Sequence, residues 1–189
     1  MPVVVNRWHL KQAVCAIKLG GIIAYPTESV YGLGCDPENP EAVHELLAIK
    51  NRPVDMGLIL IAAGLQQLQP YISTVKRQIL DHMVATWPGP VTWLVPARPE
   101  VPEWIRGAHD TVAVRITAHP VAAALCAMID TPLISTSANL HGGVTARNMM
   151  RVRRIFGDAI TYILPGHIGG LKNPTEIRDA LTNRVIRPA

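Results

Sequence analysis

Apolar stretches of two kinds alternate along the chain, and this alternation restricts the fold more than any other feature. One kind is short and apolar at every position, as in residues 58–62 (LILIA), which is typical of a strand covered on both faces of a sheet. The other kind repeats at helical spacing, as in residues 7–19, where Leu10, Val14 and Ile17 share one face. We therefore predict an α/β fold with a central sheet.

The same patterns assign most of the chain to helices or strands. Asn39 followed by Pro40 is a typical helix start, because Asn caps the first turn and Pro suits its first position. Helices are predicted at residues 7–19, 40–50, 74–86, 120–129 and 148–156. Strands are predicted at residues 22–25, 58–62, 91–95, 111–116, 133–136, 159–164 and 185–186.

Length and composition exclude several classes of protein. The chain has 189 residues, the size of one domain, and we predict a single domain over residues 1–189. Hydrophobic residues make up 49% and charged residues 17%, a balance that excludes intrinsic disorder. The longest apolar stretch, residues 121–129, is far shorter than the roughly 20 residues of a membrane span. The net charge of +4 permits an anionic ligand or RNA.

The N-terminus and the cysteines indicate a cytoplasmic protein. The first ten residues, MPVVVNRWHL, lack the basic and then apolar pattern of a secretory signal. Cys15, Cys35 and Cys126 are odd in number and far apart, so they are predicted to be reduced thiols. Cys15 and Cys126 fall in apolar helical segments, where we expect them to be buried.

Small hydroxyl side chains collect where two predicted strands end, and open α/β sheets bind ligands at such ends. Thr27 and Ser29 lie in residues 26–34 (PTESVYGLG), after the strand at 22–25. Residues 135–139 (STSAN) overlap the end of the strand at 133–136 and form a dense set of donors for a carboxylate or phosphate oxygen. Either segment could equally be an ordinary turn whose hydroxyls satisfy backbone groups.

Three cations are also candidates for a binding site. Lys50 and Arg52 end the helix predicted at 40–50 and could hold a polyphosphate, Arg as a planar fork and Lys as a point charge. The alternative is that they only complement the negative end of the helix dipole. Arg115 is more informative, because it lies in an apolar strand, where burying an arginine is costly unless it is paired or binds something.

Missing motifs narrow the field further. The sequence has no GxxxxGK[ST], so a P-loop would not hold ATP, and no GxGxxG after a strand, which argues against a dinucleotide fold. Its histidines never occur at HxxxH or HxH spacing, so no permanent metal site is predicted. The lack of a GxSxG elbow argues against acyl-transfer hydrolysis.

Several motifs together resemble the YrdC/TsaC family, the threonylcarbamoyl-AMP synthases of tRNA modification. The resemblance covers residues 22–188 and is to the short, single-domain bacterial form. It implies a twisted mixed β-sheet flanked by helices, with a concave, positively charged cavity. The motifs, in the family's order and spacing, are PTESVYGLG (26–34), KNR (50–52), WPGPVT (87–92), VAVR (112–115), STSAN (135–139) and RP (187–188).

This resemblance implies an activity and a set of partners. The enzyme would join L-threonine, bicarbonate or carbon dioxide, and ATP, giving threonylcarbamoyl-AMP and pyrophosphate. The product would pass to a transferase complex that forms threonylcarbamoyladenosine (t6A) in tRNA. Binding of tRNA or double-stranded RNA by the chain itself is also implied.

The resemblance assigns roles to eight residues. Lys50 and Arg52 would be the catalytic pair at the ATP phosphates. The residues implied at threonine are Thr27, Arg115, Ser137 and Thr175, and those implied at ATP are Lys50, Arg52, Asn139 and Arg187.

Four positions depart from the family pattern. Met56 stands where relatives carry a lysine or asparagine near ATP, and Ile61 stands where the longer form has a histidine near threonine. His141 replaces a serine, and Ser29 replaces a threonine or alanine. We expect one phosphate contact to be affected at Met56 and one threonine contact to be absent at Ile61.

The implied chemistry needs positioning and charge stabilisation more than a general base, because the carbamate formed from threonine and carbon dioxide is already an anion. A Mg²⁺ ion is expected to arrive with ATP and to be held mainly by the triphosphate. The alternative function is a non-catalytic RNA-binding maturation factor. Its basic face would be formed by Arg147, Arg151, Arg153 and Arg154, which could equally be an ordinary solvated face.

Overall fold

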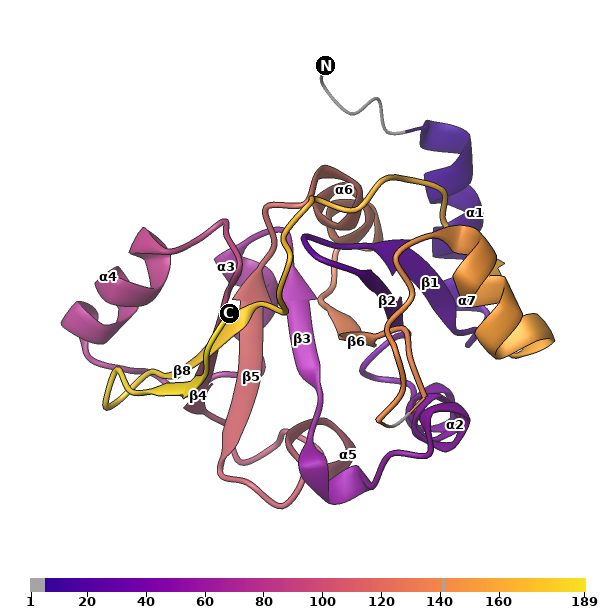
Figure 1. Cartoon of the computed structure of the whole chain (residues 1–189). Helices are drawn as coiled ribbons and strands as arrows, with labels where there is room; N and C mark the ends of the chain where they lie inside the picture. The colour runs from indigo at the N-terminus through magenta and orange to yellow at the C-terminus, as the bar shows by residue number, and fades with distance from the viewer. Residues whose placement is uncertain (1–5, 141) are drawn as a thin grey trace.

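The computed structural model describes residues 6–140 and 142–189, which form a sheet with helices around it (Figure 1). Residues 1–5, half of the ten that lack the pattern of a secretory signal, and His141 lie outside the described residues. The helices are α1 (Arg7–Lys18), α2 (Pro40–Lys50), α3 (Leu65–Leu68), α4 (Arg77–Ala85), α5 (Glu103–Arg106), α6 (Pro120–Ile129) and α7 (Met149–Phe156). The strands are β1 (Ile23–Pro26), β2 (Tyr31–Gly34), β3 (Ile59–Ala62), β4 (Val91–Pro96), β5 (Thr111–Ile116), β6 (Leu133–Ser137), β7 (Tyr162–Ile163), β8 (Glu176–Asp179) and β9 (Val185–Arg187).

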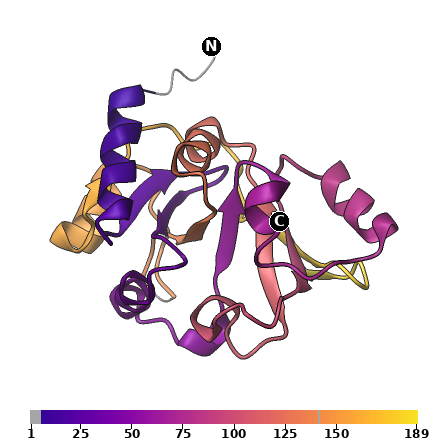
Figure 2. The ribbon, with the colours of Figure 1, turned by 180° about the vertical axis from the view of Figure 1, so that it is seen from behind.

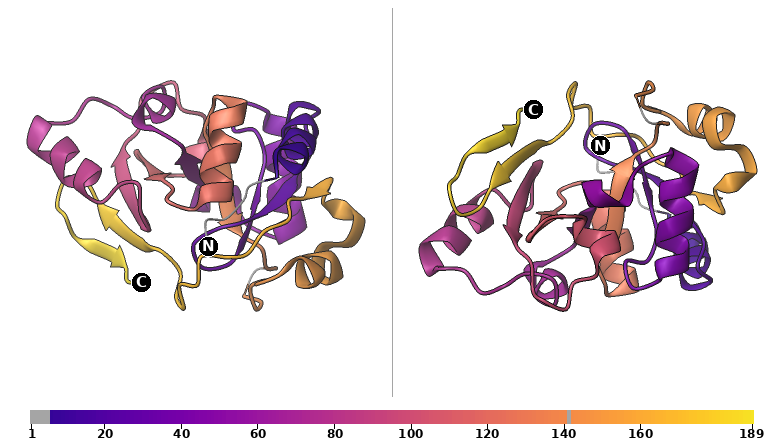
Figure 3. Two further views of the ribbon diagram at one scale, coloured as in Figure 1. Left: turned by 90° about the horizontal axis from the view of Figure 1, so that it is seen from above. Right: turned by 90° about the horizontal axis from the view of Figure 1, so that it is seen from below.

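The strands form one mixed sheet, as the resemblance implied. Its order is β7-β1-β2-β6-β3-β5-β4-β8-β9, with parallel pairs at β1–β7, β3–β5 and β4–β8 and antiparallel pairs elsewhere. The view from behind shows β3 and β5 at its centre (Figure 2). Seen from above, the C-terminal segment runs along one side of the molecule from α7 to the β8–β9 hairpin (Figure 3).

Two hydrophobic clusters pack on the sheet. The larger contains side chains of α2, α4, α5 and α7, and the smaller joins α1 and α6 to Ile23, Tyr25, Ile61 and Leu133. Side chains two residues apart in a strand share a face, so Ile59 lies on the same sheet face as Ile61. Helices α1 and α6 therefore cover only one part of this face, and the other part stays open for a cavity.

The predicted helices 40–50 and 120–129 are confirmed without change, and Asn39 caps α2 as expected, accepting a hydrogen bond from the amide of Ala42. The strand predicted at 111–116 is also confirmed without change, as β5, whereas other elements differ from the prediction. Strand β2 lies within the segment 26–34 that was predicted as a turn, strand β8 was not predicted, and the strand expected at 159–164 is only β7. Cys126 is buried as predicted, but Cys15 is exposed, because it lies on the face of α1 opposite Val14 and Ile17.

None of the helices in the described residues combines the length and apolarity that crossing a bilayer requires.

Candidate functional site

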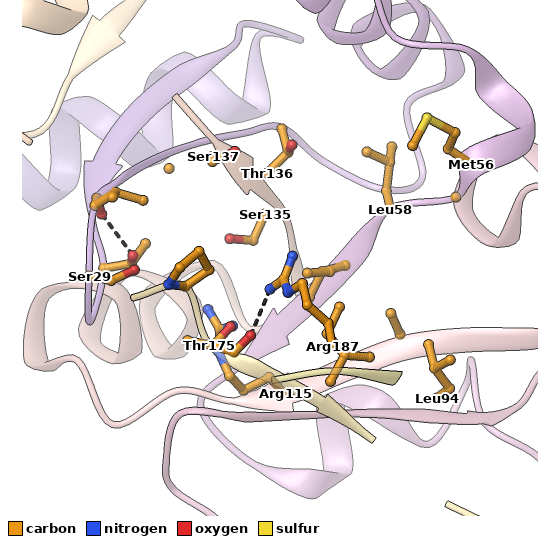
Figure 4. Close-up of a pocket in the computed structure, with 18 of the residues that line it drawn as sticks. Ser29, Met56, Leu58, Leu94, Arg115, Ser135, Thr136, Ser137, Thr175 and Arg187 are labelled. Carbon is orange, nitrogen blue, oxygen red and sulfur yellow. Dashed lines mark hydrogen bonds between the residues drawn. The ribbon is translucent and has the colours of Figure 1, made fainter. Parts of the chain in front are cut away.

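A cavity of about 490 Å³ opens on the part of the sheet face that α1 and α6 leave uncovered (Figure 4). Register places Ser135 of β6, Ile59 of β3 and Ala113 of β5 in one row across its floor. Gly32 of β2 continues this floor beside Ser137. Because these side chains are small or absent at four of the five positions, the floor leaves room for a ligand. The walls come from the loop after β1, the segment between α2 and β3, and the segment before β8.

The cavity brings together six of the eight residues predicted from the resemblance. Two predicted residues, Lys50 and Asn139, are not part of its lining. The six that line it are Thr27, Arg52, Arg115, Ser137, Thr175 and Arg187.

Arg115 is the most completely held cation of the site. It is buried, with 4% of its surface exposed, and its Nη1 donates hydrogen bonds to the hydroxyls of Thr175 (2.8 Å) and Thr92 (3.2 Å). Its Nη2 lies 3.4 Å from the carboxylate of Glu28. Of the two possibilities predicted for this strand arginine, that it is paired or that it binds something, the structure shows the pairing.

Glu28 is the site residue that the sequence reasoning missed. Its carboxylate Oε1 accepts a 2.6 Å hydrogen bond from the Thr117 hydroxyl and a 3.3 Å bond from the Ala118 amide. Burial alone would raise the pKa of this carboxyl, but Arg115 and the Thr117 hydroxyl outweigh burial and hold it below its ordinary value. Glu28 therefore carries a negative charge directly behind the cavity wall. From the sequence we considered the hydroxyl groups of its neighbours Thr27 and Ser29. The alternation of side chains along this segment was the signal that could have led to Glu28.

The loop between β1 and β2 is tied down on both sides. The Thr27 hydroxyl donates a 2.7 Å hydrogen bond to the Val30 carbonyl. The Thr27 carbonyl accepts from the amide of Gly169, and the Glu28 carbonyl accepts from Leu171. These contacts fix Thr27 and Ser29 at the cavity wall. The segment is thus a strand hairpin with an ordered loop, and both earlier interpretations of it hold in part: its hydroxyl satisfies a backbone group, and its side chains line a cavity.

Lys50 and Arg52 lie at the end of α2, where Asn51 adopts the left-handed conformation (φ 49°) and stops the helix. Arg52 lines the cavity and donates a 2.9 Å hydrogen bond to the Gly57 carbonyl, but its buried Nε has no partner. Burial lowers the pKa of Arg52. An arginine with a buried unused donor beside a cavity is suited to an anionic ligand.

Lys50 is placed differently from its neighbour. It is buried, and its Nζ donates hydrogen bonds to the carbonyls of Ser137 (2.5 Å) and Asn139 (2.7 Å). Burial, helped by the charge of Arg52, lowers the pKa of Lys50 to about 8. In this structure Lys50 joins the end of α2 to the segment that follows β6.

The segment after β6 is folded into a compact turn. The Ser137 hydroxyl donates a 2.6 Å hydrogen bond to Asn139 Oδ1, and Asn139 Nδ2 donates to the carbonyls of Leu140 and Gly143. Ser137 faces the cavity, whereas the Asn139 side chain is used within the turn. The ordinary-turn interpretation therefore describes Asn139 in this structure, and the ligand interpretation fits Ser137.

Arg187 reaches the cavity from β9 and donates a 2.7 Å hydrogen bond to the Thr175 carbonyl (Figure 4). Burial lowers its pKa, and the nearby charges of Arg115 and Arg52 lower it further. Among the described residues, the cavity lining contains no aspartate or glutamate. Its cationic side chains are Arg52, Arg106, Arg115, Arg147, Lys172 and Arg187.

Two of the departures can be located. Met56 lines the cavity and is 46% exposed, so it offers a thioether where relatives were expected to offer a polar contact. Ile61 is fully buried in the cluster under α1 and α6 and is not part of the lining.

No three His, Cys, Asp or Glu side chains of the described chain come close enough together to hold a metal ion.

Comparisons with known proteins identify relatives of the whole chain. The family model named for Sua5, YciO and YrdC, described as telomere recombination, matches residues 15–189. The threonylcarbamoyl-AMP synthase of Pseudomonas fluorescens (strain Pf0-1) is 50% identical over 185 residues, which cover 98% of this chain and 100% of that relative.

Solved structures show the same fold. The crystal structure of P. abyssi Sua5 complexed with L-threonine matches with a TM-score of 0.90 and 31% identity, over 97% of this chain and 54% of that chain. This chain thus spans about half the length of that protein. The crystal structure of E. coli YciO matches with a TM-score of 0.81 and 28% identity, over 92% of this chain and 84% of that chain.

Proposed function

The chain belongs to the YrdC/Sua5 family of threonylcarbamoyl-AMP synthases, nucleotidyltransferases that use ATP and threonine in t6A modification of tRNA, and we propose that the cavity is where this reaction takes place. One observation carries the proposal. A buried arginine, Arg115, which is paired with Glu28 and bonded to two threonine hydroxyls, lies in the same cavity as Arg52 and Arg187, for which the described residues provide no carboxylate partner. Two anionic ligands of different size would suit these two environments.

The Arg115 end of the cavity is proposed to bind L-threonine. An arginine held by Thr92 and Thr175 can present a fixed guanidinium edge to an amino-acid carboxylate. Hydroxyls of Thr27 and Ser137 line the same cavity and can hydrogen-bond the polar groups of a small amino acid. The relative solved with L-threonine supports this choice of ligand.

The Arg52 and Arg187 end is proposed to bind the ATP phosphates. The buried Nε of Arg52 lacks a partner. The two positive charges near Arg187 disfavour the charged form of its guanidinium. A polyphosphate would relieve both conditions, because it supplies acceptors and negative charge at once. The six lining cations and the lack of acidic lining residues in the described chain support a positive potential in the cavity.

Lys50 and Asn139 take a modified role in this proposal. Lys50 donates hydrogen bonds to the carbonyls of Ser137 and Asn139. It would therefore support the phosphate end from outside the cavity lining, unless its ammonium moves toward bound ATP. Asn139 would reach a nucleotide only by giving up its bonds to Leu140 and Gly143. Both remain candidates at ATP, through their positions beside Ser137.

The reaction proposed for this site joins threonine, bicarbonate or carbon dioxide, and ATP. The threonine nitrogen forms a bond to the carbon of carbon dioxide and loses a proton, giving a carbamate. A carbamate oxygen then forms a bond to the α-phosphorus as the bond to pyrophosphate breaks. Arg52 and Arg187 would stabilise the charge on the phosphates, while Arg115 would hold the threonine in line.

The cavity lining suits a Mg²⁺ ion that enters with ATP. Without lining carboxylates in the described residues, the cavity has hydroxyls but no acidic ligands for a resident ion. We propose that the triphosphate carries the ion and that the ion offsets charge on the phosphates.

Partners beyond the substrates are also proposals. The product would go to a transferase complex that modifies tRNA, in keeping with a cytoplasmic enzyme. Contact with RNA would involve the exposed arginines that lie on or next to α7: Arg147, Arg151, Arg153 and Arg154.

Pyrophosphate release tests the proposed function. The purified chain with Mg²⁺ should release pyrophosphate only when ATP, bicarbonate and threonine are all present. Release that does not depend on threonine would contradict the proposal. Replacing Arg151, Arg153 and Arg154 of α7, which are not part of the cavity lining, should weaken RNA binding while leaving pyrophosphate release unchanged.

A further inference from the structure

The cations around the cavity differ in whether a buried carboxylate faces them. Glu28 lies 3.4 Å from Arg115, and both side chains are almost entirely buried. Among the described residues, Arg52, Arg147, Lys172 and Arg187 form no ion pair, and the pair of Arg106 with Glu103 is longer, at 3.7 Å, and its carboxylate is exposed. One cation of the cavity is therefore largely neutralised by the protein, and four are not.

The position of Glu28 is fixed independently of Arg115. Thr117 and the Ala118 amide both donate to its Oε1, and the backbone of the loop is bonded to Gly169 and Leu171. Oε2, the oxygen nearer Arg115, accepts no hydrogen bond within the described structure. The carboxylate is thus held by one oxygen, while the other faces the guanidinium as an unshared charge. If Glu28 served only to satisfy the hydrogen bonds of Thr117 and Ala118, its second oxygen would not need to face Arg115.

The negative charge of Glu28 affects which of the two substrates binds beside Arg115. This step rests on the proposed function. ATP carries several negative charges on its phosphates, whereas threonine presents one carboxylate. A cavity with equally strong cations at both ends would favour the polyphosphate at both, because specificity is a difference of affinities. Pairing Arg115 with Glu28 lowers its attraction for a multiply charged group, and its fork geometry still suits a single carboxylate.

We infer that Glu28 is a specificity-determining residue that keeps the triphosphate out of the threonine end of the cavity. It acts through Arg115 and makes no contact with either substrate. Its charge reserves the buried guanidinium for a monocarboxylate, and its hydrogen bonds to Thr117 and the Ala118 amide keep the carboxylate in place.

Inorganic tripolyphosphate is a suitable probe, because it has the phosphates of ATP without the nucleoside. In the wild-type chain it should inhibit pyrophosphate release by competing with ATP and not with threonine. In Glu28→Gln it should also compete with threonine, and its apparent affinity should rise about 10-fold to 100-fold, the effect of freeing one guanidinium for a charged ligand. The threonine KM should rise at high ATP, because the phosphates of ATP then compete for the freed guanidinium, and high ATP should become inhibitory.

Control variants separate charge from structure. Glu28→Gln/Arg115→Gln removes both charges, so threonine should bind poorly while tripolyphosphate competes with ATP alone. Glu38→Gln makes the same change outside the cavity, at an exposed residue that bonds Tyr71, and should behave as wild type. If Glu28→Gln raises the threonine KM with no new competition between tripolyphosphate and threonine, Glu28 is only a structural support and the inference is wrong.

The wild-type chain provides a test that needs no variant. If tripolyphosphate competes with threonine in the wild type, the threonine end is open to phosphates and the inference fails even if Glu28→Gln does not fold. A wild type that releases no threonine-dependent pyrophosphate would instead contradict the proposed function. The two failures therefore give different results.

Discussion

Arg115 and Arg52 both present a guanidinium to the same cavity, but the fold holds them in opposite ways. Arg115 projects from the middle of the sheet and has two threonine hydroxyls and a carboxylate around it. Arg52 follows the end of a helix, bonds one backbone carbonyl and forms no ion pair with the described residues, whereas the buried Nε has no partner in either arginine. The difference teaches that one end of the cavity is organised before any ligand binds. The other end gains its missing contacts from the ligand.

Removing Arg115 should have the largest effect, because it breaks the organised end. Arg115→Met leaves Glu28 buried without its cation, which typically lowers the free energy of unfolding by about 3–5 kcal/mol. Urea denaturation at pH 7 measures this loss. A loss below about 1 kcal/mol would show that the ion pair is not needed to hold this end.

Lowering the pH should reveal how much the pair of Arg115 and Glu28 contributes to the free energy of unfolding. The folded pKa of Glu28 is lowered, so its contribution to stability is present above the unfolded value of about 4.3 and is lost as pH falls through the folded value. In Arg115→Met the strongest influence that lowers this pKa is lost while the Thr117 hydroxyl stays, so the pKa of Glu28 should rise relative to the wild type and the variant should lose less stability as pH falls. Denaturation curves between pH 7 and pH 3 compare the two chains. Parallel curves would contradict this account.

Arg52→Ala should affect binding more than folding. Losing a charge-assisted contact to phosphate costs about 1.5–3 kcal/mol, so the ATP affinity should fall by roughly one to two decades. Threonine affinity without nucleotide should barely change, and the unfolding transition should stay within about 0.5 kcal/mol of wild type. Isothermal titration with each ligand tests both statements. A larger loss for threonine than for ATP would place the phosphates elsewhere.

Lys50 lies between the two regions and should show itself in the pH dependence of stability. Its folded pKa is about 8 and its unfolded value about 10.4, so between these values the unfolded chain binds more protons. This lysine should therefore make stability rise with pH in that window, by at most about 1.4 kcal/mol per pH unit. Lys50→Met should remove that part of the slope.

An exposed lysine provides the matched control for this measurement. Lys76→Met makes the same change at a residue outside the cavity and should leave the slope unchanged. Equal slopes for wild type and Lys50→Met would show that the ammonium of Lys50 is not held as the structure has it.

Ser137→Ala should have the smallest effect. It removes a neutral hydroxyl from the cavity and one bond to Asn139, and a neutral hydrogen bond is worth about 0.5–1.5 kcal/mol. The loss should fall chiefly on threonine affinity, measured by titration without ATP. An equal or larger loss of ATP affinity would mean that this hydroxyl, with Asn139, belongs to the phosphate end.

The sequence predicted the parts of this comparison that depend on local patterns. Arg115 stood out because a charged residue in an apolar strand requires a partner. Its partner could not be identified, since Glu28 is far away in sequence and nothing near it in sequence marks it as paired. Helix α2 was predicted to its exact bounds, because Asn39 and Pro40 are local start signals.

Strand β2 was missed for a related reason. Its segment is rich in hydroxyl residues, which are typical of turns, and its two glycines are unusual in a strand. In the fold, a Cβ on Gly34 would lie 2.1 Å from the Ile134 carbonyl oxygen, so the glycine is there to let β6 approach. Strand β8, EIRD, has too few apolar residues to be recognised, and it is in the sheet through its pairing with β4.

The order of strands in the sheet has a consequence for how the enzyme is made. Thr27 comes from the loop after β1, while Thr175 and Arg187 come from the β8–β9 hairpin, which pairs with β4 across a long stretch of chain. Pairings so distant in sequence form slowly. During translation, the threonine end cannot close until the ribosome has released this hairpin, long after Thr27 has emerged. A nascent chain should therefore bind neither substrate, and either substrate present in the cell would stabilise only the finished protein.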